Sequence, residues 1–109
     1  MAVLTNSYVK TQVKKILPLG DTTIYDDKLD ILIAGAISKL SSEGVPIDAK
    51  DKDGNSIFTE GANISFDYCN CISYQIMKDM DFDVDMNFMT EQYITRIGTL
   101  RCFISMKQH

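Results

Sequence analysis

Hydrophobic residues recur every three or four positions through one central stretch of the chain. The members of this stripe are Leu29, Leu32, Ile33, Ala36, Ile37 and Leu40. An α-helix has about 3.6 residues per turn, so this spacing places all of them on one helical face. We predict a helix from about Asp27 to Ser41 or Ser42, which Asp26 or Asp27 caps because a short carboxylate accepts a free backbone N–H there. Gly44 then marks its end.

Three further helices are predicted by weaker patterns. Residues 6–17 carry a hydrophobic stripe, and Asn6 or Ser7 is the expected N-cap. Residues 62–78 are apolar on nearly every side and include only two charged side chains. Residues 88–106 again place hydrophobic side chains along one main face. The chain therefore predicts four helices, of which the third has to be buried on nearly every side.

The segment between the second and third predicted helices, residues 44–61, has a different character. Its Asp53-Gly54 pair is a turn dipeptide with β-favouring residues on both sides, which predicts a short hairpin or loop excursion. A chain of 109 residues suits one domain. We therefore predict an all-α fold, a small bundle of about four helices with this excursion between the second and third, in a single domain over residues 1–109.

The composition agrees with a small globular protein rather than a disordered or membrane-spanning one. Hydrophobic residues make up 45% of the chain, and no apolar run approaches the roughly 20 residues of a membrane helix. The net charge of −4 is unevenly spread, because residues 21–91 hold all 15 acidic side chains and the two ends are basic. An acidic middle is poorly suited to gripping the phosphates of duplex DNA. The basic ends suit an acidic protein surface or the acidic middle of a neighbouring copy, unless they are plain solvated charge.

The cysteine pattern and the first residues of the chain favour a cytosolic protein. Residues 1–6 lack the charged start and apolar core of a signal peptide. Cys69, Cys71 and Cys102 form an odd count with two of them inside one predicted helix, which is a poor disulfide framework. A zinc site needs four ligands, and the single histidine is His109. We expect buried free thiols and no metal or other cofactor.

One loop has part of the spacing of a calcium site. Asp51, Asp53 and Asn55 match the first three ligands of a helix–loop–helix calcium loop. The sixth and twelfth positions of such a loop should be Gly and Glu, but here they are Ser56 and Ala62. Because the bidentate glutamate is missing, we interpret this stretch as a polar turn.

Acidic and apolar residues alternate strictly after the third predicted helix, over residues 79–86. The acidic members are Asp79, Asp81, Asp83 and Asp85. In an extended backbone these carboxylates share one side at a spacing of about 7 Å, which is too far to converge on one metal ion or to form a catalytic acid–base pair. We predict an extended connector whose acidic side faces water, and which forms a strongly negative surface if it repeats around a ring.

The third predicted helix offers the best candidate for a partner interface. Four of its side chains, Phe66, Cys69, Tyr74 and Met77, lie largely outside its main hydrophobic stripe. One small domain has difficulty covering a helix that is apolar on all sides, and a second copy or another partner is the natural cover. We therefore predict that these four residues form a subunit or partner interface and that the protein works as an oligomer.

This order of elements resembles the head–tail connector (adaptor) proteins of tailed bacteriophages. The residues that carry the resemblance are Asp26-Asp27, Leu29, Leu32-Ile33, Ala36-Ile37 and Leu40, with the preceding helix to Leu17-Pro18 and the apolar helix around Tyr68 to Ile76. The resemblance implies a ring of about a dozen copies below the portal protein, which extends the DNA channel and docks the next connector or a tail protein. It implies no enzymatic activity, no membrane contact, and passage of DNA without specific binding. The acidic row of Asp79, Asp81, Asp83 and Asp85 matches no motif of that family and is a separate candidate for a surface that faces the channel. The resemblance places the protein at the head–tail junction of the virion, and in the host cytoplasm during assembly.

Two other classes of function stay open on the sequence alone. A small cytosolic regulator or antitoxin-like interaction module would use the apolar third helix to cover one partner in a closed dimer. A metal-dependent enzyme or calcium-binding module would use the aspartates of residues 51–55 or 79–85, although neither set matches a complete site. A closed dimer would favour the first class, and a rise in thermal stability with added calcium or magnesium would favour the second.

Overall fold

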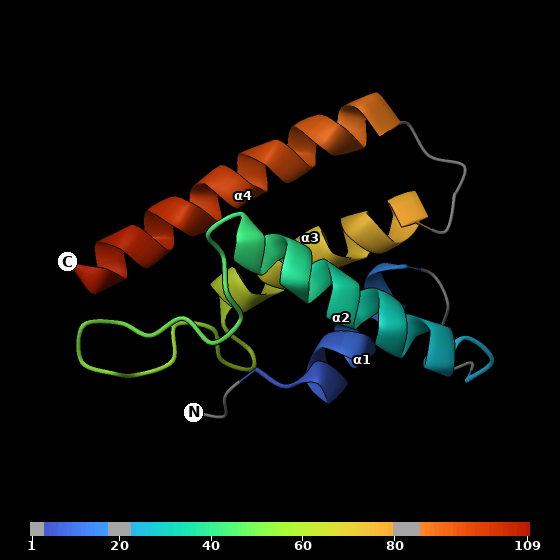
Figure 1. Cartoon of the computed structure of the whole chain (residues 1–109), viewed down its shortest axis with the longest axis horizontal. Coiled ribbons are helices and arrows are strands. Elements are labelled where there is room, and N and C mark those ends of the chain that lie inside the picture. Colours follow the sequence, from blue (N-terminus) through green and yellow to red (C-terminus); the bar gives the residue numbers. More distant parts are fainter. Residues whose placement is uncertain (1–3, 18–22, 80–85) are drawn as a thin grey trace.

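The computed structural model describes residues 4–17, 23–79 and 86–109, which form an all-α fold of four helices (Figure 1). The helices are α1 (Asn6–Ile16), α2 (Asp26–Ser42), α3 (Asn63–Asp79) and α4 (Met86–Gln108). The described residues include no strand, only one isolated bridge in the loop between α2 and α3, residues 43–62. The predicted all-α bundle of about four helices is therefore confirmed. Within the described parts of the chain, no helix combines the length and apolar character needed to cross a membrane.

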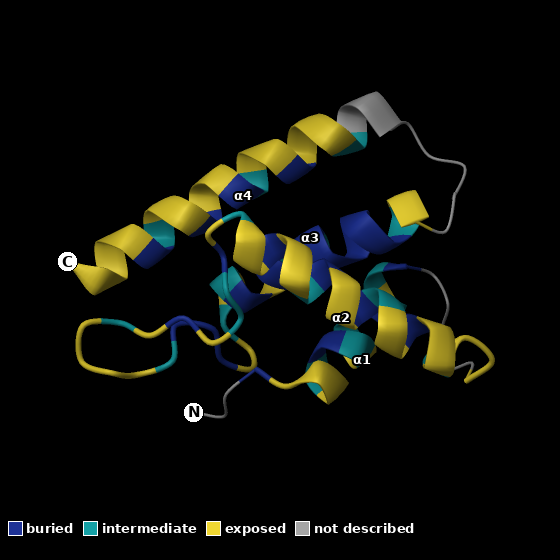
Figure 2. Cartoon of the chain, viewed as in Figure 1, coloured by how far each residue is buried: buried dark blue, intermediate teal, exposed yellow. Residues whose placement is uncertain are grey.

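Helix α3 lies at the centre of the bundle and packs against each of the other three helices. Figure 2 shows α3 as buried over most of its length, whereas the outer sides of α2 and α4 are exposed. The largest buried side chain on α3 is Tyr68, whose ring lies 5.0 Å from the ring of Phe58 in the loop. The loop therefore closes the core at the end where α3 begins.

Helix α2 confirms the stripe that the sequence predicted. Its core side chains are Leu29, Ile33, Ala36 and Leu40, with Leu32 and Ile37 partly buried beside them. The predicted aspartate cap is wrong, because Tyr25 occupies the N-cap position and makes no side-chain cap hydrogen bond. Asp26 instead lies in the first turn, where its Oδ1 is 2.5 Å from the Nζ of Lys14 on α1. Lys10 and Asp30 form a second ion pair between α1 and α2, at 2.9 Å.

The N-cap of α1 is Thr5, one residue before the predicted candidates. The Tyr8 backbone N–H donates a hydrogen bond of 3.1 Å to the Thr5 Oγ1. Asn6 and Ser7 lie inside the first turn, so the prediction that one of them caps the helix is wrong. A hydroxyl at the cap satisfies one of the backbone donors that a helix start leaves free.

The predicted excursion between α2 and α3 is a loop rather than a hairpin. The Asp51 Oδ1 accepts hydrogen bonds of 2.9 Å from the backbone N–H groups of Asp53 and Asn55. The Lys52 backbone N–H donates to the Lys107 carbonyl at 3.0 Å, which docks the loop on the end of α4. The Asp51 carboxylate thus closes its own turn. Across the described residues, no three or more His, Cys, Asp or Glu side chains are grouped so that they could hold a metal ion.

The cap of α1 gives a direct test of this local structure. Thr5→Ala should lower the free energy of unfolding by about 1 kcal/mol, because the Tyr8 N–H would lose its acceptor. Asn6→Ala is the matched control, and as an exposed non-capping position it should change stability by less than about 0.5 kcal/mol. Urea denaturation followed by circular dichroism measures both values. Equal losses for the two substitutions would contradict the assignment of Thr5 as the cap.

Candidate functional site

The four side chains predicted to form an interface lie in different surroundings. Cys69 and Tyr74 are 0% and 6% exposed, so the chain itself supplies the cover that was expected of a partner. Phe66 is 53% exposed, and Met77 is partly buried at the edge of the core. We expected that one small domain would have difficulty covering α3. For Cys69 and Tyr74 this expectation is wrong, because α1, α2 and α4 all pack on α3. Within the described parts of the chain, no helix covers one side of α3, and the candidate site lies there.

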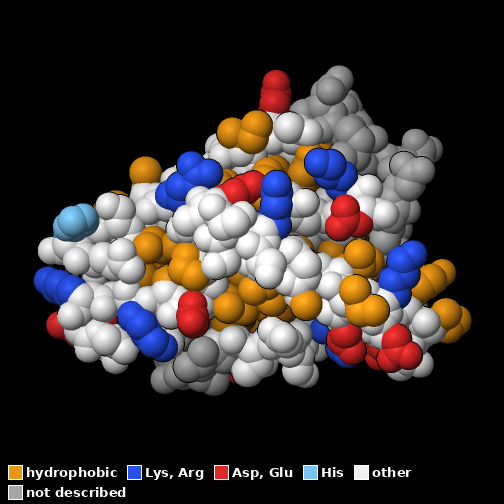
Figure 3. Space-filling view, viewed as in Figure 1, with side chains coloured by type: hydrophobic (Ala, Val, Ile, Leu, Met, Phe, Trp, Pro, Cys, Tyr) orange, Lys and Arg blue, Asp and Glu red, His pale blue; other side chains and the backbone are white. Residues whose placement is uncertain are grey.

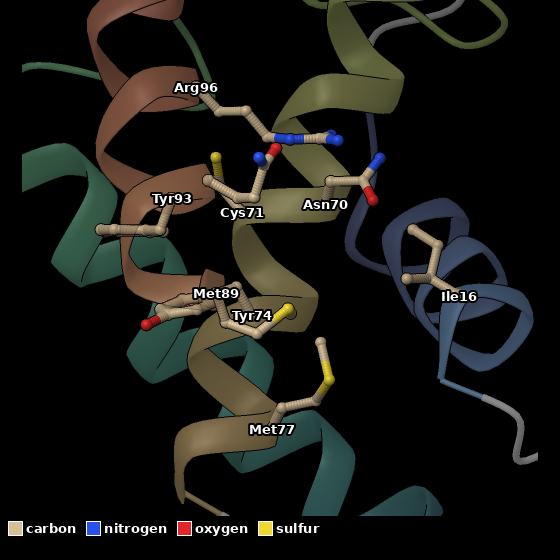
Figure 4. A pocket seen from close by; sticks show the side chains of 9 residues that line it. Ile16, Asn70, Cys71, Tyr74, Met77, Met89, Tyr93 and Arg96 are labelled. Atoms are coloured by element: carbon tan, nitrogen blue, oxygen red, sulfur yellow. The ribbon is translucent and has the colours of Figure 1, made fainter. Parts of the chain in front are cut away.

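A groove runs between α1 and α4 with α3 as its floor (Figure 4). Its lining consists of Ile16 on α1, Asn70, Cys71, Tyr74 and Met77 on α3, and Met89, Gln92, Tyr93 and Arg96 on α4. We call this surface the α1–α4 groove. Its volume is about 360 Å³, which is within the range of pockets that bind ligands or several side chains. It includes two of the predicted interface residues, Tyr74 and Met77.

The groove follows from the way α3 is packed. Successive spacings of four, four and three residues place Phe66, Asn70, Tyr74 and Met77 on one face of the helix. The opposite face carries the fully buried Tyr68, Ile72 and Ile76. Helix α1 packs against α2 and α3, and α4 packs against α3, so α1 and α4 form the two walls. Sequence periodicity identified part of the floor but missed both walls, since these depend on how distant segments are arranged.

Two stacked tyrosines fix the α4 wall against the floor. The rings of Tyr74 and Tyr93 lie 4.9 Å apart with an interplanar angle of 20°. The Tyr74 hydroxyl and the Thr90 Oγ1 share a hydrogen bond of 2.6 Å, and the Tyr93 hydroxyl donates to the Glu43 Oε2 at 2.8 Å. Burial, and then the hydrogen bond to Glu43, raise the pKa of Tyr93 above its ordinary value. The stacked rings and these two hydrogen bonds hold the α4 wall in place against the floor.

The two ends of the groove differ in chemistry. At one end the Arg96 Nη1 lies 3.6 Å from the Asp67 Oδ1, a long ion pair between partly exposed side chains that contributes little in water. At the other end Met77 and Met89 lie across the groove from Ile16 (Figure 4). Methionine side chains are flexible and polarisable, so they adapt to whatever packs on them. The groove therefore suits a hydrophobic side chain at one end and an acidic group at the other.

The cysteine in the groove is not prepared for nucleophilic chemistry. Cys71 is fully buried, and burial raises the pKa of its thiol to about 12. Burial raises the pKa of Cys69 to about 12 as well. The prediction of buried free thiols holds for these two, whereas Cys102 is free but exposed on α4. Because the thiolate is the reactive form, thiols with so high a pKa are inert at neutral pH.

The predicted acidic row falls mostly outside the described part of the chain. Asp79 is exposed at the end of α3, so it lies in a helix rather than in the predicted extended connector. Asp81, Asp83 and Asp85 lie outside the described residues. The role predicted for the row as a whole therefore stays a prediction.

Comparison of this chain with protein-family models, with curated proteins and with solved structures finds no match in any of the three. The resemblance to head–tail connectors thus stays an expectation based on the pattern of the sequence. The function has to be argued from the groove and from the exposed surfaces of this chain.

The buried thiols predict a pH dependence of stability. Cys69 and Cys71 have an ordinary pKa of 9.0 and a pKa of about 12 in the fold, so unfolding releases protons between these values. Their contribution to the free energy of unfolding should be intact below pH 9 and should fall as the pH rises toward 12. Urea denaturation at a series of pH values measures this slope.

The matching variants identify the groups responsible. A Cys69→Ala, Cys71→Ala double variant should show a shallower fall in stability above pH 9. Cys102→Ala is the control and should keep the wild-type slope, because this thiol is exposed. A double variant with the wild-type slope would show that the two thiols are not the groups that titrate.

Proposed function

We propose that this protein is a structural subunit that assembles with copies of itself into a ring, as in the head–tail connector of a tailed bacteriophage. The observation that carries the proposal is the α1–α4 groove, a partly open hydrophobic surface in which Arg96 is the single charged residue among the described lining residues. A surface of this kind suits the side chains of another protein subunit, because the core of an interface is apolar and poor in charge.

Exposed hydrophobic side chains on other elements support self-association. Ile31 on α2 is 74% exposed, and Ile94 and Met106 on α4 are 64% and 75% exposed. Figure 3 shows hydrophobic and acidic side chains next to each other at the right-hand end of the molecule, near the start of α2. Contacts between two different surfaces of identical subunits close into a ring when the rotation between neighbours allows it. A groove and a separate exposed face supply two such surfaces.

The charge of the chain suits a ring through which DNA passes. The net charge is −4, and an acidic channel lining repels phosphates rather than holding them. In this proposal the partners are copies of the chain, the portal protein above and the next connector or tail protein below. The place of action is the head–tail junction of the virion, with the host cytoplasm as the site of assembly.

A second candidate function, a dimeric regulator or antitoxin-like module, is favoured by the outer face of α4. This face has a shallow hollow of about 520 Å³ lined by Thr95, Gly98, Thr99, Cys102, Phe103 and Met106. A glycine among small side chains allows another helix to approach closely. Two copies could pair through this face about a two-fold axis, which would give a closed dimer.

Assembly of the wild-type chain and of two methionine variants distinguishes the two functions. Light scattering behind size-exclusion chromatography, with negative-stain images, should show a wild-type ring of about a dozen copies. Met77→Glu should remain monomeric, because an unpaired charge buried in the groove costs several kcal/mol. Met106→Glu is the matched control on the outer face of α4 and should still form rings.

The opposite pattern would support the dimeric module. In that case the wild type is a dimer at every concentration, Met106→Glu is monomeric, and Met77→Glu still pairs. Thermal melting of both variants shows that any loss of assembly is not a loss of the fold.

A further inference from the structure

We infer that α4 is a strap that opens while α1, α2 and α3 stay folded, and that Glu43 is the latch that holds it closed. This inference concerns a single copy of the chain and goes beyond the proposed assembly. Because α4 carries one wall of the α1–α4 groove, the position of the strap also determines whether the groove exists.

Helix α4 is attached differently from the other three helices. Helices α1, α2 and α3 each pack against the other two, and ion pairs of Lys10 with Asp30 and of Lys14 with Asp26 join α1 to α2. Among the described residues, the extensive helix contacts of α4 are with α3, and Figure 1 shows α4 along one side of the other helices. Opening of α4 therefore leaves the mutual packing of the first three helices in place. Such a local opening requires less free energy than global unfolding.

The buried surface of α4 is narrow. In the described part of this helix the buried side chains are Tyr93, Ile97, Leu100 and Ile104, a single row at spacings of four, three and four residues. Figure 2 shows most of the remaining surface of α4 as exposed. Because this row is narrow, polar links supply a large share of what holds α4 closed.

Two of these polar links meet at Glu43, the C-cap residue of α2. The Tyr93 hydroxyl donates to the Glu43 Oε2 at 2.8 Å, and the Arg101 Nε donates to the Glu43 carbonyl at 2.6 Å. Tyr93 is 8% exposed, so its hydrogen bond to a carboxylate is shielded from water and is stronger than an exposed one. One residue next to α2 thus holds α4 at two points about two turns apart.

The strap couples the groove to the rest of the fold. When α4 opens, Tyr93 and Arg96 leave their places on the groove wall, and Tyr74 on α3 loses the ring that stacks on it. A partner that fills the groove therefore binds the closed form alone, and its binding slows the opening of α4.

Two buried thiols on opposite sides of α3 distinguish opening of the strap from global unfolding. Cys71 lies beside Tyr93 and Arg96 of α4 (Figure 4), so opening of the strap exposes it. Cys69 is two residues earlier, or about 200° around the helix, so it faces away from α4 and is exposed by global unfolding. Burial holds the pKa of both thiols at about 12, against an ordinary value of 9.0, so each reacts only after it is exposed.

Thiol labelling of the native chain tests the strap. Cys102→Ala is combined with Cys69→Ala or with Cys71→Ala to leave one thiol, which is labelled with an aromatic disulfide reagent at about pH 8. Cys71 should react at least about 10-fold faster than Cys69, and its rate should rise less steeply with urea, because a local opening exposes less surface. Equal rates with equal urea dependence would overturn the inference. So would a Cys71 rate independent of urea, since the reagent would then reach this thiol without movement of α4.

Removal of one hydroxyl tests the latch. Tyr93→Phe keeps the ring on Tyr74 and removes the hydrogen bond to Glu43, so labelling of Cys71 should become about 10-fold faster. The same bond is lost in global unfolding, so labelling of Cys69 should become faster by a similar factor. An unchanged Cys71 rate would overturn the assignment of Glu43 as the latch.

A matched hydroxyl away from the strap provides the control. The Tyr8 hydroxyl on α1 accepts the Gly61 backbone N–H at 3.0 Å, and this hydrogen bond does not involve α4. Tyr8→Phe should therefore change the Cys71 rate by less than about 2-fold while it speeds the labelling of Cys69 severalfold, because the bond persists in the open form and is lost only in global unfolding. Equal acceleration of both thiols by Tyr8→Phe would show that α4 opens only with the whole fold, and would overturn the inference.

Discussion

Covering a helix that is apolar on nearly every side is the constraint on which the rest of this structure depends. Nine side chains of α3 are buried, including the polar Ser65, Ser73 and Gln75. The Ser73 hydroxyl donates to the Cys69 carbonyl one turn earlier, at 2.9 Å, which satisfies that polar group inside the core. Helices α1, α2 and α4 all pack against α3. The loop adds the ring of Phe58, which contacts Tyr68 in the first part of α3. The groove is the side that three helices leave open.

The sequence predicts the elements better than their ends. The stripe from Leu29 to Leu40 identifies both the helix and its buried face, because burial selects hydrophobic residues at helical spacing. Caps are harder to predict, since Thr5 and Asn6 are both acceptable cap residues and only the backbone geometry decides between them. The loop shows the same limit: Asp53-Gly54 signals a turn, but the bonds from Asp51 and the docking of Lys52 on α4 decide its form.

The candidate site is half visible in the sequence. The periodicity of α3 singles out Tyr74 and Met77, and both line the groove. It also singles out Cys69, which the chain buries, because a helical wheel shows which residues share a face but not which neighbour covers it. The walls depend on the directions of α1 and α4 in space, and no local pattern around Ile16 or Arg96 encodes those directions. Tertiary packing therefore decides which apolar side chains of α3 are left for a partner.

An opening on one side of a central helix also limits the strength of any single contact made there. Fully burying one hydrophobic side chain contributes about 1.5–3 kcal/mol, which is less than the free energy lost when two free molecules associate. A single contact made through the groove would therefore be weak by itself. In the proposed ring every copy would make two such contacts, and the last contact would form between ends that are already held close together. Such a subunit would be marginally stable as a pair and more stable as a ring, and a surface that presents many copies of one binding site would drive its assembly.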